Sequence, residues 1–376
     1  MEERHLISSN MKWKEVLEIK SGKNQKDVAD INGSYPIYGS GGIIGYSKEY
    51  LCPAGTTIIG RKGTINSPLY VNEPFWNVDT AFGLIPSQQL VSKYLYYFCC
   101  YFNFKALDKS TTIPSLAKRD LENVEMPVPP LDEQSRIVAH IEELFSELDK
   151  AVDTLKTTKE QLEVYRQAVL KDAFSCLPET VEMDKIADMI DPQPSHRTPP
   201  EYKNGIPYIG IGDIDYQNKK INFEDARKVS PEVLDEHLRR YTIHKGDFVM
   251  GKIGTIGKPY KIPDEQNYAL SANVILIQPN KEKIDPEFLF WQFSSSLVTK
   301  QLTLGAKATS QPAFGIKKAR LLSIKICELE KQFKIIKRLE AEMSCCDNIE
   351  KTVDTALAQA DAMRQSILKQ AFEGKI

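Results

Sequence analysis

Two short segments framed by glycine carry the side chains best suited to contact a nucleic-acid backbone. They are Gly60-Arg61-Lys62-Gly63-Thr64 and Gly251-Lys252-Ile253-Gly254-Thr255. Glycine lets a loop approach a polynucleotide closely, cationic side chains neutralise phosphate, and threonine hydroxyls can donate hydrogen bonds to it. A tight turn in a β-sheet framework would explain the repeated pattern equally well. The predicted phosphate contacts are Arg61, Lys62, Thr64, Lys252 and Thr255.

The sequence contains no pattern typical of a metal site, a catalytic nucleophile or nucleotide hydrolysis. The seven cysteines contain no Cys-x-x-Cys pair, and the five histidines form no pair with the spacing of metal ligands. No glycine-rich phosphate loop of the ATPase kind and no convincing set of nucleophile and base are present. We therefore expect neither a metal site nor hydrolytic chemistry in this chain.

A methyl-transfer enzyme is the one enzymatic alternative that the residues suggest. Ile37-Tyr38-Gly39-Ser40-Gly41 loosely resembles the glycine loop that binds S-adenosylmethionine, and Asn72-Glu73-Pro74-Phe75 is one residue away from the Asn-Pro-Pro-Phe motif of amino-methyltransferases. The two segments are too close in sequence to hold the strands and helices of a cofactor-binding fold between them. We therefore rank a self-contained DNA adenine methyltransferase below the other interpretations.

The composition is that of a globular protein without a strong charge bias. The 376 residues are 41% hydrophobic and carry a formal net charge of −2, with the acidic excess on residues 131–176. No apolar run approaches the roughly 18 residues of a membrane span, and the charged start does not resemble a signal peptide. The sequence thus predicts a cytoplasmic protein of several domains, and its charge neither supports nor excludes binding to nucleic acid.

The chain contains an internal repeat. Residues 131–174 align without a gap with residues 329–372 at an offset of 198, and fifteen of the aligned positions are identical. The clearest match is Arg166-Gln167-x-x-Leu170-Lys171-x-Ala173-Phe174 against Arg364-Gln365-x-x-Leu368-Lys369-x-Ala371-Phe372. The preceding regions match more weakly, through the glycine segments and through Thr111-Thr112 opposite Thr309-Ser310-Gln311. The order is therefore a module, a helix, a second module and a second helix.

Both repeated segments have the apolar spacing of long paired helices. One apolar row recurs every seven positions, and a companion row recurs beside it. The first row consists of Ile141, Leu148, Leu155, Leu162 and Val169, and of Leu339, Cys346, Val353, Ala360 and Ile367. The companion row consists of Ile137, Leu144, Ala151, Thr158 and Tyr165, and of Ile335, Ile349, Ala356 and Met363. Antiparallel pairing is favoured over separate docking of each helix, because the gapless repeat keeps both rows in register.

Outside these helices the sequence predicts strand-rich modules, because short β-branched and aromatic runs alternate with glycine and proline turns. The expected fold class is α+β: two mixed, strand-rich α/β modules joined by two long helices that form an antiparallel coiled coil with approximate two-fold symmetry. The predicted divisions are a first module at 1–130, a central helix at 131–176, a second module at 177–328 and a final helix at 329–376.

The order of parts and the helix motifs resemble the specificity (S) subunit of type I restriction–modification systems. The resemblance rests on Pro127-Val128-Pro129-Pro130-Leu131-Asp132-Glu133-Gln134-x-x-Ile137-Val138, on Arg166–Phe174 and on Arg364–Lys375, and it covers essentially the whole chain. The second lead-in, Ile326–Gln332, departs from this pattern because it lacks the double proline and the Glu-Gln pair.

The resemblance implies a non-catalytic DNA-recognition subunit. Each module would be a target recognition domain for one half of a bipartite, asymmetric site in double-stranded DNA, while the helices set the spacer and dock two methyltransferase (M) subunits. The M subunits would bind S-adenosylmethionine and methylate adenine N6, and two restriction (R) subunits would cleave DNA with ATP and magnesium. This chain would carry no cofactor itself. A degenerate S-like scaffold without DNA specificity is the remaining alternative.

Base readout is expected from residues that differ between the modules, because the two half-sites would differ. The candidates are Tyr38, Ser40, Tyr46 and Asn66 in the first module and His196, Arg197, Lys203 and Lys258 in the second. An ordinary surface turn explains any single one of them as well. Weaker candidates are the two threonine-rich segments, Lys118-Arg119, Lys317-Lys318 and Arg320. Arg166-Gln167 and Arg364-Gln365 are predicted to bind the paired helix or a partner subunit.

Overall fold

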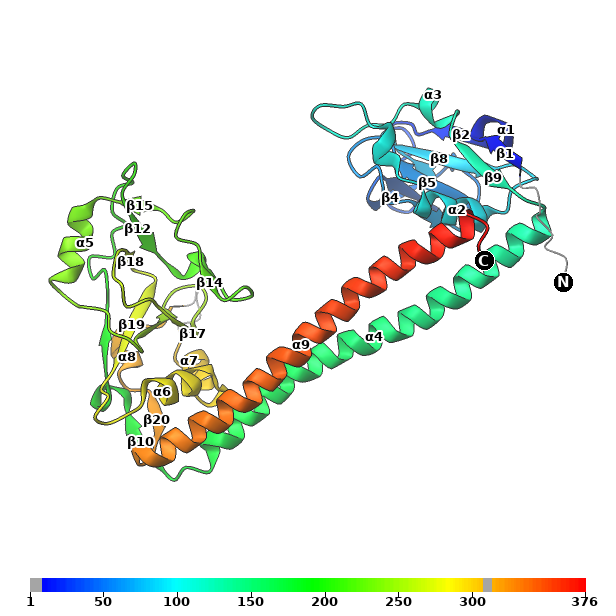
Figure 1. The fold of residues 1–376 in the computed structure, drawn as a ribbon. Coiled ribbons are helices and arrows are strands. Elements are labelled where there is room, and N and C mark those ends of the chain that lie inside the picture. Colours follow the sequence, from blue (N-terminus) through cyan, green and yellow to red (C-terminus); the bar gives the residue numbers. More distant parts are fainter. Residues whose placement is uncertain (1–8, 307–312) are drawn as a thin grey trace. The chain divides into compact units, whose positions relative to one another are not determined.

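The computed structural model describes residues 9–306 and 313–376, which form two compact units (Figure 1). Unit 1 combines the residues up to 156 with residues 354–376, and unit 2 consists of residues 157–353. Each unit therefore contains one strand-rich module and a part of both long helices. The four segments predicted from the sequence divide the chain differently, and that division stays a prediction.

Unit 1 is built around a four-stranded antiparallel sheet with the strand order β2-β8-β5-β6. The central strand β5 is buried along its whole length, which suits its β-branched sequence Thr-Thr-Ile-Ile. A second sheet has the order β4-β3-β7, and β1 pairs with β9. The strands are β1 (Ser9–Lys12), β2 (Leu17–Ser21), β3 (Tyr35–Gly39), β4 (Gly42–Ser47), β5 (Thr56–Gly60), β6 (Leu69–Val71), β7 (Trp76–Asn77), β8 (Ala81–Pro86) and β9 (Glu125–Val128). The helices of this module are α1 (Trp13–Val16), α2 (Ser92–Tyr101), the 3-10 helix η1 (Phe104–Leu107) and α3 (Lys118–Leu121).

Unit 2 repeats this frame with the order β11-β19-β16-β17 in its four-stranded sheet. A three-stranded sheet has the order β15-β12-β18, while β13 pairs with β14 and β10 with β20. The strands are β10 (Glu179–Glu182), β11 (Ala187–Ile190), β12 (Ile206–Ile209), β13 (Ile214–Asp215), β14 (Lys220–Ile221), β15 (Lys228–Val229), β16 (Phe248–Gly251), β17 (Gly257–Lys261), β18 (Ala269–Leu270), β19 (Val274–Pro279) and β20 (Ser323–Ile326). The helices are η2 (Met183–Lys185), η3 (Ile211–Asp213), α5 (Pro231–Leu238), α6 (Pro286–Ser294), α7 (Ser296–Gly305) and α8 (Ile316–Ala319). The expectation of two related, strand-rich modules is confirmed.

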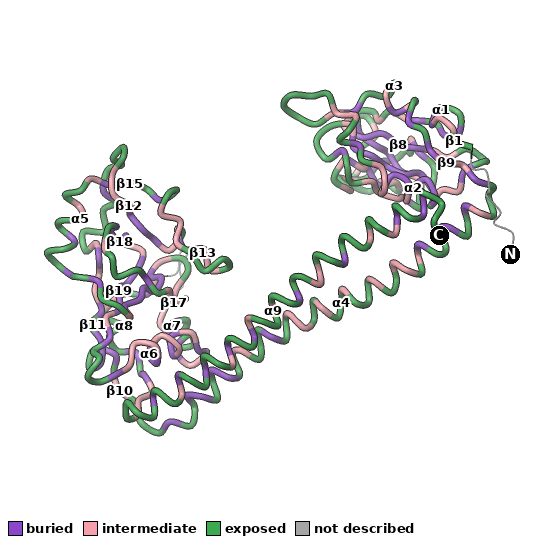
Figure 2. Tube along the Cα trace, in the orientation of Figure 1, coloured by how far each residue is buried: buried purple, intermediate pink, exposed green. Residues whose placement is uncertain are grey.

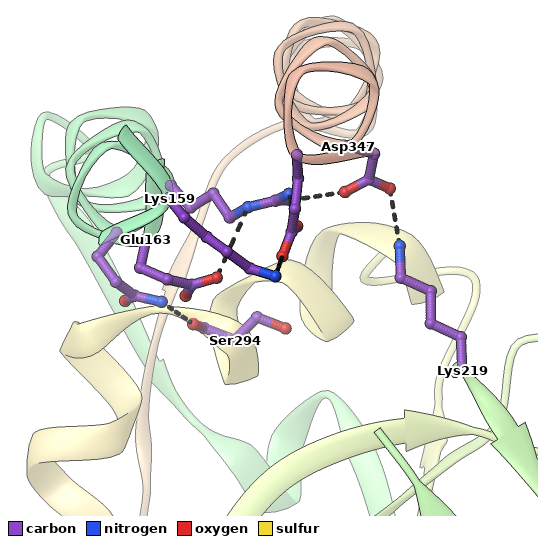
Figure 3. Close-up of polar contacts among 8 residues, drawn as sticks. Lys159, Glu163, Lys219, Ser294 and Asp347 are labelled. Carbon is purple, nitrogen blue, oxygen red and sulfur yellow. Dashed lines mark hydrogen bonds and ion pairs between the residues drawn. The ribbon is translucent and has the colours of Figure 1, made fainter. Parts of the chain in front are cut away.

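The two long helices are α4 (Leu131–Ser175) and α9 (Leu329–Phe372), and they pair in antiparallel. In unit 1, Arg364 near the end of α9 donates a hydrogen bond to Asp149 of α4. In unit 2, Arg166 near the end of α4 donates to Asp347 of α9 over 2.7 Å, and Lys219 of the β13–β14 turn binds the other oxygen of Asp347 (Figure 3). The two arginine–aspartate pairs occupy equivalent positions of the repeat. The predicted contact of both arginines with the paired helix is therefore confirmed.

Buried, half-buried and exposed residues alternate along both long helices (Figure 2). Their burial confirms one predicted apolar row and corrects the other. The first row is buried or half-buried throughout, with Leu339 and Cys346 among its most enclosed members. In the companion row, however, Tyr165 is 51% exposed, Ile349 40% and Met363 54%. A pair of helices covers only a narrow stripe on each member, so positions at the edge of the stripe face outward. No helix in the described part of the chain is long and apolar enough to cross a lipid bilayer.

A buried phenylalanine anchors the end of each long helix in the core of a module. In unit 1, Phe372 of α9 packs against Tyr94 and Phe98 of α2, with ring centroids 5.1 and 5.3 Å apart. In unit 2, Phe174 of α4 packs edge to face against Phe288 of α6 at 5.3 Å. The repeated Ala-Phe ending is thus explained by apolar burial against the helix that covers each four-stranded sheet.

A fully buried glutamine fixes the start of each long helix. Gln134 accepts a hydrogen bond from the Val91 N–H and donates to the Pro129 carbonyl, each over 2.8 Å. Gln332, at the equivalent repeat position, accepts from the Asp285 N–H over 2.8 Å and donates to the Cys327 carbonyl over 2.7 Å. Helix α9 therefore starts at the same repeat position as α4, although its lead-in lacks the double proline.

Candidate nucleic-acid interface

The sheet topology brings two loops to the same end of each four-stranded sheet. In unit 1, β2 and β5 are both antiparallel to β8, so they run in the same direction; Ser21 pairs with Phe82 and Gly60 with Ala81. In unit 2, Ile190 of β11 and Gly251 of β16 likewise lie beside the start of β19. The loop after β2 therefore lies at the same sheet end as the turn after β5, and the loop after β11 lies at the same sheet end as the turn after β16. We call these loops together the sheet-end surface: residues 22–28 and 61–64 in unit 1, and residues 191–199 and 252–256 in unit 2.

The two glycine segments form the same tight turn, and their glycines have structural roles. A Cβ atom on Gly60 would lie 2.0 Å from the Thr64 carbonyl oxygen, and one on Gly251 would lie 1.7 Å from that of Thr255. Gly63 and Gly254 have φ angles of 79° and 75°, a region that other residues rarely adopt. The turn alternative therefore accounts for the repeated glycines, and DNA contact by the other side chains of the two segments stays a prediction.

The cationic residues of the two turns differ in how free they are. Lys62 and Thr64 are exposed, and Thr255 is exposed in the other turn. Arg61 is half-buried, with its guanidinium 5.6 Å from the centroid of the Phe82 ring. Lys252 is only 5% exposed, and its Nζ lies 2.8 Å from Asp191 Oδ2. Phosphate contact by Lys252 stays a prediction, although it would require this buried ion pair to open.

The threonine-rich segment of unit 1 lies against the glycine turn. The Gly63 N–H donates to the Pro114 carbonyl over 2.8 Å, and the Leu116 N–H donates to the Arg61 carbonyl over 2.9 Å. Thr111 and Thr112 are exposed just before this contact. In unit 2 the corresponding contact is a 2.9 Å hydrogen bond from the Phe314 N–H to the Lys252 carbonyl. The predicted residues Thr309, Ser310 and Gln311 lie outside the described residues.

The candidate base readers of unit 1 do not share one environment. Tyr46 is 48% exposed and lines a hollow of about 390 Å³ together with Gln25 of the sheet-end surface. Tyr38 is half-buried with its ring edge-on to Phe75, and burial raises the pKa of its hydroxyl. The Asn66 side chain accepts a hydrogen bond from the Phe104 N–H over 2.8 Å. Asn66 thus has a local structural role, whereas Tyr46 lies beside a loop of the sheet-end surface.

In unit 2, two of the four candidates lie on the sheet-end surface. His196 and Arg197 are exposed on the loop after β11, and His196 has a φ angle of 53°. Lys203 is also exposed, farther along the same connection. Lys258 instead holds its Nζ 5.5 Å from the centroid of the Tyr216 ring, and its carbonyl accepts a hydrogen bond from the Tyr216 hydroxyl. His196 Nε2 and Lys252 Nζ lie 4.0 and 2.8 Å from the same oxygen of Asp191, so the structure brings these two predicted residues together.

Comparison with known proteins places this frame in a family. The family model described as "Type I restriction modification DNA specificity domain" matches twice, over residues 8–164 and 178–359. This chain belongs to that family. Its two specificity domains, as we call the matched regions from here on, correspond to the two strand-rich modules and most of the two long helices.

Individual relatives agree with this assignment. The chain is 24% identical over 376 residues to the type I restriction enzyme EcoBI specificity subunit of Escherichia coli, covering 92% of this chain and 78% of the relative. It is 25% identical over 349 residues to the MjaVIII specificity subunit of Methanocaldococcus jannaschii, covering 86% and 76%.

Two solved structures share the fold at low sequence identity. A chain from a structural study of complex assembly and conformational transition of the type I R-M system has a TM-score of 0.73 at 16% identity, covering 98% of both chains. The HsdS subunit of Thermoanaerobacter tengcongensis has a TM-score of 0.53 at 16% identity, covering 98% of this chain and 97% of that one. Two strand-rich modules with paired long helices are thus the fold of known specificity subunits.

The basic residues that precede the long helices have mixed environments in the two specificity domains. Lys118 and Arg119 are exposed on α3 of the first domain. In the second domain, Lys318 donates to the Gly305 carbonyl over 2.7 Å, and Arg320 donates to the Met189 carbonyl over 3.2 Å. DNA contact by these residues stays a prediction. Among the described residues, no group of three His, Cys, Asp or Glu side chains could hold a metal ion.

The sequence analysis did not identify two lysines on the sheet-end surface and one histidine beneath it. Lys23 and Lys26 are exposed on the loop after β2, and no motif in the sequence indicates them. Beneath the loop after β11, the imidazole of His237 is fully buried between Gln193 and Tyr241, with contacts of 3.0 and 2.8 Å. A single histidine on a short helix carries no sequence signal for such a contact.

The buried His237 predicts that the second specificity domain loses stability in mild acid. Burial, with a smaller contribution from Arg240, lowers the pKa of His237 from 6.5 to about 4. Its neutral form therefore stabilises the fold fully above pH 6.5, and this contribution is lost as the pH falls from 6.5 towards 4, by up to about 2 kcal/mol at pH 5. Thermal unfolding at pH 7 and pH 5 should show a larger fall in Tm for the wild type than for H237Q. The exposed-site control H140Q should behave like the wild type, and equal falls in all three proteins would refute the assignment.

Proposed function

We propose that this chain is the DNA-specificity subunit of a type I restriction–modification complex. The observation that carries the proposal is the double match to the specificity domain on two units with the same sheet frame. The loops at the two sheet ends differ in sequence, as expected if each domain binds a different half of a bipartite, asymmetric site in double-stranded DNA. The paired helices would set the spacer between the half-sites.

The catalytic steps are assigned to partner subunits in this proposal. Two M subunits would bind S-adenosylmethionine and transfer methyl groups to adenine N6, and two R subunits would supply ATP- and magnesium-dependent cleavage. The chain itself would act by recognition alone and would hold no cofactor. Two equivalent M subunits are supported by apolar residues exposed at equivalent positions of the repeat, Tyr165 on α4 and Met363 on α9.

Docking of the M subunits is tested by placing a charge at both equivalent positions. In a methyl-transfer assay on unmethylated genomic DNA, the M subunits with the wild-type chain should transfer methyl groups, and the chain alone should transfer none. The double variant Tyr165→Arg and Met363→Arg should lose at least about ten-fold of the transfer, because an arginine buried at an interface without a partner is costly. Glu160→Arg with Ala358→Arg, at two other exposed positions that are equivalent in the repeat, should retain activity. Methyl transfer by the chain alone would instead favour a self-contained methyltransferase.

The phosphate contacts of the first domain are tested by the salt dependence of DNA binding. Replacing Arg61 and Lys62 by alanine should weaken binding across DNA sequences and lower the slope of log K against log salt by up to about two. The measurement is fluorescence anisotropy of the complex on a DNA duplex at several salt concentrations. Replacing Lys150 and Lys156, which are exposed on α4, provides the matched control with two charges removed. An unchanged slope in the Arg61 and Lys62 variant would refute their phosphate role.

A further inference from the structure

The loops after β2 and after β11 each combine a backbone held by hydrogen bonds with exposed cationic side chains. In unit 2, the Asp191 carboxylate pairs with Lys252, and Arg240 donates to the Asp191 and Pro192 carbonyls over 2.7 and 2.6 Å. A few residues later, the Arg227 Nε donates to the Pro199 carbonyl over 3.3 Å. The loop is thus held at both ends by side chains that belong to other elements of the same domain.

A series of hydrogen-bonded side chains that reaches into the protein interior holds the middle of this loop. Gln193 Oε1 lies 3.0 Å from His237 Nε2, while His237 Nδ1 lies 2.8 Å from the Tyr241 hydroxyl. The amide of Gln193 in turn donates to the Ser195 hydroxyl over 2.9 Å and to the Arg197 carbonyl over 3.3 Å. Gln193 therefore connects the buried His237 to the backbone of Arg197, whose side chain is exposed.

The equivalent loop of unit 1 is held by a different set of contacts. The Trp76 indole N–H and the Lys23 N–H both form backbone hydrogen bonds of 3.0 Å, the first to the Lys23 carbonyl and the second to the Asn77 carbonyl. Gly22 lies so close to the Val78 carbonyl that a Cβ atom would be 1.9 Å from its oxygen. Lys23 and Lys26 nevertheless remain exposed. Both loops thus present cations from a backbone that other residues hold in place.

Such a combination suits base readout better than general phosphate contact. Phosphate neutralisation tolerates a flexible lysine, whereas a base edge must be met within a fraction of an ångström and therefore needs a side chain whose backbone is fixed. Lysine and arginine donate to the O6 and N7 acceptors of guanine in the major groove. The adjacent glycine turn can approach the phosphates of the same segment.

We propose that residues 22–28 and 191–199 are the base-reading elements of the two specificity domains, that each reads guanine edges through its exposed cations, and that Trp76 and the Gln193–His237 pair are positioning residues for them. The inference rests on the proposed function and goes beyond it by naming the recognition element and its base class. Lys23, Lys26 and Arg197 make the base contacts, while Trp76, Gln193 and His237 act through them.

The test uses the complete complex with its M subunits and reads the methylated motif in genomic DNA. Trp76→Phe removes the hydrogen bond to the Lys23 carbonyl but keeps a ring, and Gln193→Ala removes the contacts to His237, Ser195 and the Arg197 carbonyl. Each variant should lower the preference for the correct base pair over the other base pairs by about ten-fold, at one or more guanine-containing positions of a single half-site. The two variants should affect opposite halves, and the untouched half should stay as selective as in the wild type.

Matched controls separate positioning from general destabilisation. Trp291→Phe removes an indole N–H for which the described residues offer no partner, and Gln217→Ala removes a side chain exposed in the β13–β14 turn. Both should leave the motif unchanged. If Trp76→Phe prevents assembly, Lys23→Ala with Lys26→Ala tests the same loop through exposed side chains alone.

The outcomes distinguish the inference from the proposed function. If the wild-type complex yields no bipartite motif, the proposed function fails. If the wild type yields a motif but the loop variants leave both half-sites as selective as in the wild type, the assignment of the reading loops is overturned. The same holds if each variant relaxes both half-sites together. Relaxed half-sites that contain no guanine–cytosine pair would overturn the assigned base class.

Discussion

Exchanging residues 13–124 for the corresponding part of another specificity subunit will change one half of the methylated site and leave the other half unchanged. The exchanged segment contains the whole sheet-end surface of unit 1 but leaves β1, β9 and both long helices in place. The two four-stranded sheets have separate cores, and the loops at each sheet end contact only residues of their own domain in the hydrogen bonds described above. Base specificity should therefore transfer as a unit.

Methylation mapping of genomic DNA, in cells that supply the same M subunits, measures the effect of this exchange. The length of the unspecified spacer should stay the same, because the helices are unchanged. The reciprocal exchange of residues 183–322, which keeps β20 and both helices, should change the opposite half-site. A motif altered in both halves by either exchange would contradict independent recognition by the two domains.

Arg166→Glu will strongly destabilise unit 2. Arg166 is 16% exposed and binds two carboxylates of α9, Asp347 over 2.7 Å and Glu350 over 2.8 Å (Figure 3). Burial alone would raise the pKa of Asp347, but Lys219 and Arg166 lower it below its ordinary value. Reversing the charge of Arg166 would therefore place another carboxylate beside Asp347 and Glu350 of α9 and close to Glu163 of α4. We expect a loss of unfolding free energy of about 2 to 3 kcal/mol, because Arg166 is enclosed whereas Asp347 and Glu350 are 43% and 34% exposed and keep part of their solvation.

Thermal and urea unfolding of the full-length chain measure this loss, and two further variants interpret it. Adding Asp347→Arg should restore part of the stability, because the reversed pair recovers the attraction although Lys219 loses its partner. Arg338→Glu breaks ion pairs with Asp172 and Glu342 on the same helices, but Arg338 is 51% exposed, so its loss should cost at most about 1 kcal/mol. A similar effect of Arg166→Glu and Arg338→Glu would show that enclosure of the arginine has no importance.

The local and repeated features of this protein could be read from its sequence. A gapless repeat of apolar heptads predicted two paired helices, and their repeated arginines were expected at a helix contact, because periodicity reports which face of a helix is covered. The glycine segments could be found because they are repeated. Each turn needs a close backbone approach at its first glycine and a positive φ at its second.

The features that the sequence did not indicate depend on residues far apart in the chain. The ion pair of Lys252 is one such feature, because nothing near Lys252 in the sequence indicates Asp191, which lies 61 positions earlier and pairs with it. The contact of Gln193 with His237 spans 44 positions. The companion apolar row of the helices was overestimated because periodicity gives the centre of a buried stripe more reliably than its width.

The most direct test of a DNA-specificity subunit is methylation mapping of genomic DNA with and without this chain, in cells that contain the M subunits. Our account predicts that one bipartite motif, with two unequal half-sites and a fixed spacer, is methylated at adenine N6 only when the chain is present. Restoring the wild-type chain should restore the same motif. A methylation pattern that is identical in the presence and absence of the chain would contradict its role in DNA specificity.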